Sequence, residues 1–189
     1  MWDFLNNASV AAFVGAFCAF LLVAATDLRR RYKLRTLLRY QVADCQDHSR
    51  KKREAVQMNL ALIKKDGRIT DAPFMRFLTH GMRDYALQIL DLLDANHKQG
   101  LDALLYWMEA IDELLREATA RASRIKEFEV HSPSNPQKDI EVSRYIDALE
   151  EADRNLGYVA DLAGAYVEGR PHKILEFYHP MDGTKRNGT

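Results

Sequence analysis

The first pattern along the chain is an uninterrupted apolar run. Residues 8–25 contain no charged side chain and only Ser9 as a clearly polar one. As a helix, this run would span about 27 Å, close to the thickness of the hydrocarbon core of a bilayer. The pattern predicts a transmembrane helix. A cleaved signal peptide would need a basic segment ahead of the run, and a buried helix of a soluble protein would normally show a polar face.

After residue 26 the apolar positions recur at helical spacing, in partial stripes. Residues 27–65 contain no Pro and no Gly, so nothing in the sequence breaks a helix there. The apolar stripe fades after Cys45, is missing from 46–54, and resumes at Val56. We therefore expect a basic juxtamembrane stalk over residues 27–53, with a solvated stretch near its end.

Three further amphipathic helices are expected at about 70–97, 102–128 and 139–169, the second separated from the first near Gly100. The Ser/Pro-rich stretch 132–136 predicts a loop between the last two. Residues 170–189 form a tail, whose apolar residues 174, 175, 177 and 178 could dock one turn onto the domain and whose end, residues 181–189, is expected to be disordered. Strand-like alternation is absent, so the fold class is all-α. It comprises an N-terminal segment with a single transmembrane helix (residues 1–26), the stalk, and an antiparallel four-helix-bundle-like domain over residues 54–169.

Charge gives the predicted span an orientation. The chain is neutral overall, but residues 27–53 hold ten Lys or Arg against three Asp. Positively charged flanks stay in the cytoplasm, so we expect the N-terminus outside a cell membrane and the helical domain inside. The cluster nearest the span fits either contact with anionic lipid headgroups or a topology signal alone. Its members are Arg29, Arg30, Arg31, Lys33 and Arg35.

Small residues repeat every fourth position within the span. Ala11, Gly15 and Ala19 form one stripe, and residues 8, 12 and 16 form an adjacent stripe of alanines. Such spacing lets two helices approach closely in a membrane. It predicts a packing face for a second transmembrane helix, although alanine-rich spans show the spacing by chance.

No catalytic set emerges from the remaining residues. Two carboxylate-x-x-histidine pairs are present, one ending at His97 and one at His179, but neither lies in the middle of a predicted helix, where a bundle would hold a metal. The basic tetrad 50–53 is more typical of a solvated helix than of a nucleic-acid site. Trp107 could mark a partner surface, or lie half-buried at a helix seam, which we favour. We expect no cofactor, no metal and no small-molecule substrate.

These patterns favour a non-enzymatic protein. The leading hypothesis is a membrane-anchored interaction or scaffold protein that tethers a partner at the cytoplasmic face. We expect it to contact the lipid bilayer and either a protein partner or a second copy of itself. We do not expect it to bind nucleic acid. The alternative is an oligomerising membrane effector or signal-transducing protein. A metal-bearing helical enzyme is the least favoured reading.

Overall fold

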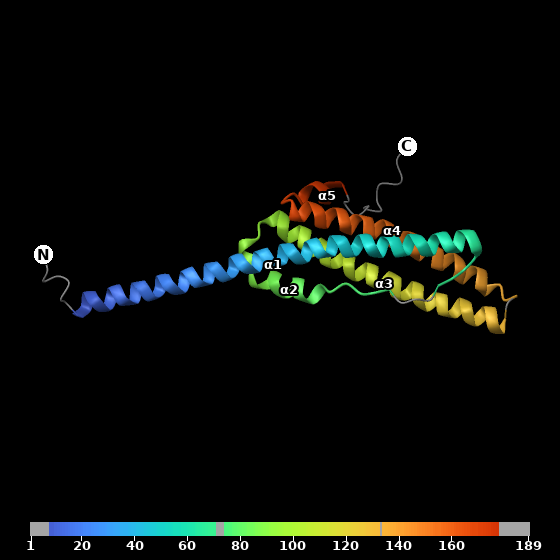
Figure 1. Ribbon diagram of the computed structural model, residues 1–189, viewed down its shortest axis with the longest axis horizontal. Helices are drawn as coiled ribbons and strands as arrows, with labels where there is room; N and C mark the ends of the chain where they lie inside the picture. Colours follow the sequence, from blue (N-terminus) through green and yellow to red (C-terminus); the bar gives the residue numbers. More distant parts are fainter. Residues whose placement is uncertain (1–7, 71–73, 133, 178–189) are drawn as a thin grey trace, which may run out of the picture.

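The computed structural model describes residues 8–70, 74–132 and 134–177, and within these ranges the chain is helical with no strand (Figure 1). The prediction of an all-α fold is therefore confirmed. The long helices are α1 (Ala8–Asp66), α3 (Ala95–His131) and α4 (Gln137–Val167). Shorter elements are α2 (Thr79–Gln88), the 3-10 helix η1 (Leu90–Leu92) and α5 (His172–Phe177).

Helix α1 runs without interruption from the apolar segment into the folded domain. At 1.5 Å per residue its 59 residues extend for about 88 Å. Its N-terminal part projects away from the other helices (Figure 1). This part is long and apolar enough to cross a membrane, and none of its most apolar stretch is buried. Gly67 ends the helix in a left-handed conformation, with φ of 63° and its N–H donated to the carbonyl of Ile63 at 2.9 Å.

The core lies where α1, α3 and α4 meet, with α2 against α1. Helices α1 and α4 run in opposite directions where they touch. Arg39, early in α1, contacts Val167 at the end of α4, and Lys64, near the end of α1, contacts Glu150. Small residues of α4 allow a close approach, because a Cβ on Gly157 would lie 3.1 Å from the Arg53 guanidinium. The largest fully buried side chains come from all four of these helices and from residue 89 between α2 and η1, namely Leu38, Met82, Ile89, Leu101, Leu104, Met108, Ile111, Leu115, Ile125, Tyr145, Leu149 and Leu156.

The expected stalk is largely part of the folded domain. Burial on α1 begins at Leu38 and continues through Ser49 and Lys52 to Ile63, so the stretch predicted to be solvated packs against the other helices. The buried positions of α1 follow steps of three and four residues, at 38, 42, 45, 49, 52 and 56. Two of them carry polar side chains, which hid the stripe in the sequence.

The helix predicted over residues 70–97 is wrong in its bounds. Residues 74–78 are not helical, α2 covers only Thr79–Gln88, and α3 already begins at Ala95. Asp94 caps α3 by accepting the backbone N–H of His97 at 2.9 Å. Gly100, expected beyond a helix end, lies inside α3, where a Cβ would come within 2.8 Å of the Pro171 ring. The glycine serves close packing there rather than termination.

The end of α4 follows the prediction closely. The helix stops at Val167, and Gly169 adopts a φ of 78° while Arg170 donates its N–H to the carbonyl of Ala165 at 2.8 Å. Pro171 is buried, and Ile174 of α5 packs against the core, so the first turn of the tail docks as expected. The disorder predicted for residues 181–189 falls outside the described residues, as does residue 178 of the predicted docking turn.

Candidate functional site

The small-residue face of α1 is open. Gly15 has no atom within 4 Å of the position that a Cβ would occupy, and Ala19 is exposed. Ala11 lies in α1, but its side chain falls outside the described ones. No described part of this chain therefore covers the face around Gly15, which remains available to a lipid or to another helix.

The basic cluster divides into two groups. Arg31 pairs with Asp27 at 2.7 Å and with Asp91 of η1, and these carboxylates raise its pKa. Arg30 donates to the side chain of Gln88 at 3.5 Å. In the part of the chain that the structure describes, Arg29, Lys33 and Arg35 make no ion pair. Two of the five predicted residues thus fasten α1 to the α2–η1 region, while the other three keep their charge available.

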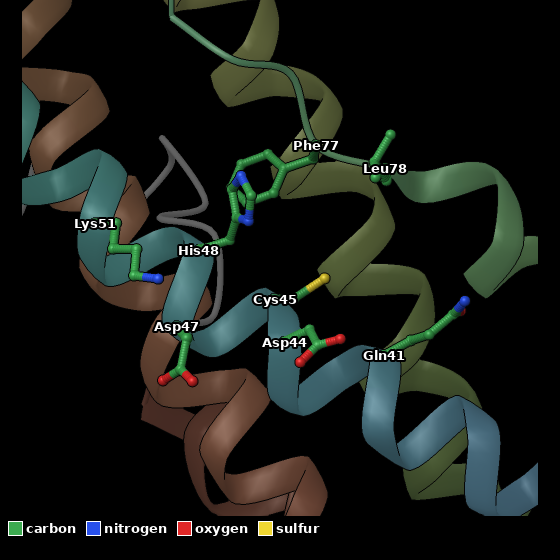
Figure 2. A pocket seen from close by; sticks show the side chains of 8 residues that line it. All are labelled: Gln41, Asp44, Cys45, Asp47, His48, Lys51, Phe77 and Leu78. Atoms are coloured by element: carbon green, nitrogen blue, oxygen red, sulfur yellow. The ribbon is translucent and has the colours of Figure 1, made fainter.

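A groove of about 330 Å³ lies between α1 and the non-helical segment before α2, and Figure 2 shows the side chains that line it. The α1 helix contributes Gln41, Asp44, Cys45, Asp47, His48 and Lys51, and the other wall is formed by Phe77 and Leu78. The rings of His48 and Phe77 lie together, with centroids 6.2 Å apart. The wall that Phe77 and Leu78 form is part of the segment that the sequence placed in a helix.

A buried ion pair fixes that segment. Lys52 Nζ lies 2.7 Å from Asp112 Oδ1 and 3.7 Å from the centre of the Phe77 ring, and Asp112 Oδ2 accepts the backbone N–H of Phe77 at 2.8 Å. Burial lowers the pKa of Lys52, although the hydrogen bond from Lys52 to Asp112 opposes this shift. One carboxylate therefore binds α3 to α1 and to the backbone before α2.

Cys45 lines the groove without being a reactive thiol. Its side chain is buried, and burial raises its pKa to about 11, with the charge of nearby Asp44 acting in the same direction. The nucleophilic form of cysteine is the thiolate. A thiol with this pKa stays protonated at neutral pH, so the residue acts as an apolar core side chain.

Comparisons of the chain with protein-family models, with curated proteins and with solved structures found no match. Any proposal for the function of this protein must therefore be argued from its sequence and structure.

Trp107 lies at the seam between α3 and α4. Its ring meets that of Tyr158 edge-on at a centroid distance of 5.6 Å, and it is partly buried against the core. The neighbouring Tyr106 stacks edge-on with it at 5.5 Å and is 66% exposed. The half-buried interpretation of Trp107 agrees with this geometry. Adjacent helix positions cannot both face the core, and the more exposed aromatic of the pair is Tyr106, which was not the residue predicted for a partner surface.

The candidate metal pair on α3 has a structural role. Both oxygens of Asp94 are engaged by His97, one by its backbone N–H and one by Nδ1 at 2.7 Å. The hydrogen bond from the His97 backbone is the main cause that lowers the pKa of Asp94. His97 also packs edge-on against Tyr166 at 5.1 Å. Within the described residues, no group of three or more His, Cys, Asp or Glu side chains is placed to hold a metal ion, and His179 of the second pair lies outside them.

The sequence missed the Lys52–Asp112 pair because its two members look like ordinary surface charges. Lys52 belongs to the basic tetrad, and Asp112 follows an apolar residue on an amphipathic helix. The available signal was spacing: Lys52 is seven residues after Cys45 and four before Val56, which places it on the same side of a helix as both.

Proposed function

We propose that this protein is a membrane-anchored scaffold whose antiparallel helical bundle holds a protein partner at the cytoplasmic face. The single observation that carries the proposal is the continuity of α1, which joins the apolar segment to the folded domain with no hinge. The positively charged flank of the span supports a cytoplasmic domain. Tethering acts by confinement, because a partner bound near the bilayer has a raised effective concentration there.

The exposed aromatic of the α3–α4 seam supports a protein rather than a small molecule as the bound partner. Tyr106 presents most of its ring to solvent beside the half-buried Trp107. Aromatic side chains supported by a rigid neighbour are frequent energetic centres of protein interfaces. The exposed ring and its support thus offer a centre for such an interface.

In-cell cross-linking tests this proposal. The full-length chain is compared with a fragment that starts at Asp27 and with a version in which residues 8–25 are replaced by an unrelated apolar span. If the protein is a scaffold, cross-linking should recover the same partner with the native and with the replaced span. The fragment should not recover that partner. Equal recovery of that partner by the fragment would show that the anchor has no role in binding it.

A second candidate function, an oligomerising membrane effector, is favoured by the open face around Gly15. Two spans that meet through this face would transmit their arrangement along the unbroken α1 into the bundle. Gly15→Ile should abolish cross-linking between copies, while Phe13→Ile, on the opposite side of the helix, should leave it unchanged. Equal cross-linking of both variants would remove the support for this candidate.

A further inference from the structure

The end of the bundle nearest the span is fastened to α1. Arg31 pairs with Asp91 of η1, and Arg30 contacts Gln88 at the end of α2. Figure 1 shows that this region lies where α1 leaves the other helices. Residue 31 lies about 9 Å along the helix from residue 25, the last residue of the apolar run. A bilayer carries a headgroup layer of about 5–8 Å on each side of its hydrocarbon core, so η1 lies at the outer boundary of that layer.

The η1 turn presents apolar side chains at this level. Leu90 is 46% exposed and Leu92 is 36% exposed, whereas Ile89 and Leu93 on either side are buried in the core. The two buried residues hold the turn in place and direct its leucines outward. Leu28 of α1, three residues nearer the span than Arg31, is 64% exposed. The end of the domain that faces the predicted membrane thus carries apolar residues that the described chain leaves partly exposed.

Basic side chains without an ion-pair partner among the described residues flank Arg31 on α1. Arg29 and Lys33, one helical turn apart on α1, make no ion pair among the described residues. Basic residues near a membrane surface are attracted to anionic headgroups. Apolar side chains beside basic ones are the composition of segments that rest in a membrane interface.

We propose that the η1 turn is a second membrane contact, in which Leu90 and Leu92 enter the headgroup layer of the bilayer that α1 crosses. This inference rests on the proposed anchor. Because η1 is fastened to α1 through Arg31 and Asp91, the contact fixes the tilt of the bundle against the membrane. A single span leaves an attached domain free to tilt, and a second contact removes that freedom.

Spin labelling of the full-length chain in nanodiscs of phosphatidylcholine and phosphatidylserine tests the contact. Nitroxide labels are placed on Leu90→Cys and Leu92→Cys, in a background with Cys18→Ser and Cys45→Ala whose helicity is checked by circular dichroism. Power saturation then compares the access of oxygen, which partitions into lipid, with that of a nickel chelate, which stays in water. A label on Val130→Cys, at the far end of α3, is the aqueous control. We expect an oxygen-to-nickel access ratio at η1 several-fold above the Val130 value.

A label on Phe20→Cys separates the failure of this inference from the failure of the anchor. If the Phe20 label is lipid-exposed and the η1 labels match Val130, the anchor stands and the second contact is refuted. If the η1 labels are shielded from both reagents, a protein covers η1 and the lipid contact is again refuted. If the Phe20 label is itself in water, the anchor fails and the proposed function fails with it.

Discussion

Replacing Asp112 with alanine should be among the most destabilising single changes in the domain. The substitution removes the carboxylate that pairs with Lys52 and accepts the Phe77 N–H. It leaves an ammonium group whose side chain is only 5% exposed without an anionic partner. The backbone donor of Phe77 would also lose its acceptor.

The expected magnitude follows from the geometry. At 2.7 Å and an effective dielectric constant of about 20, the attraction between the charges is about 6 kcal/mol. Much of this offsets the cost of removing the charges from water, but deleting one partner of a buried pair costs about 3–5 kcal/mol. Lys52→Met should cost less, about 1–2 kcal/mol, because Asp112 is 18% exposed and keeps its bond to Phe77.

A double-mutant cycle measures the effect. Denaturant unfolding of the full-length protein in mild detergent, followed by circular dichroism, gives the free energy of unfolding for each variant. Combining Lys52→Met with Asp112→Ala removes the stranded charge. The double variant should therefore be more stable than Asp112→Ala alone, by about 2 kcal/mol. If the two losses simply add, Lys52 is not held as a buried charge and the reasoning is refuted.

Three further outcomes are expected. Gly100→Ala should lower the free energy of unfolding by about 1–3 kcal/mol in denaturant titration, because its Cβ would meet the Pro171 ring. Asp94→Ala should lower it by about 1 kcal/mol through loss of the α3 cap, whereas Asp94→Asn should retain most of the cap. The pKa of Cys45 is raised from 9.0 to about 11 in the folded state, so the folded protein holds this proton more tightly, and the associated stability is lost as pH rises from 9 to 11. Cys45→Ala should therefore show a decline smaller by about 2–3 kcal/mol over that window, measured by unfolding at each pH.

The long helices were predictable because their sequences repeat one signal many times. The buried positions of α3, from Leu101 through Met108 to Ile125, follow helical spacing with no Pro in between. The end of α4 carries its own stop in Gly169. Local chemistry decides these features, so a single sequence is enough to find them.

The segment before α3 was not predictable in this way, because tertiary contacts override its local pattern. Phe74, Phe77 and Leu78 have helical spacing, yet the Phe77 N–H is taken by a carboxylate 35 residues away. Lys52 was assigned to solvent for the same reason, since its partner is 60 residues further along the chain. Pairings at such distances leave no mark on the local pattern of apolar residues.

The pairing of α1 with α4 also sets an order of assembly during synthesis. Arg39 of α1 meets Val167 of α4, its contact 128 residues later in the chain. At about 5–20 residues per second, translation needs roughly 6–26 s to supply that contact. The buried side of α1 from Leu38 onward therefore leaves the ribosome long before α4 can cover it. A nascent chain already held by its first apolar segment would spend this interval with that side uncovered, which makes it a natural client for chaperones that act near the membrane.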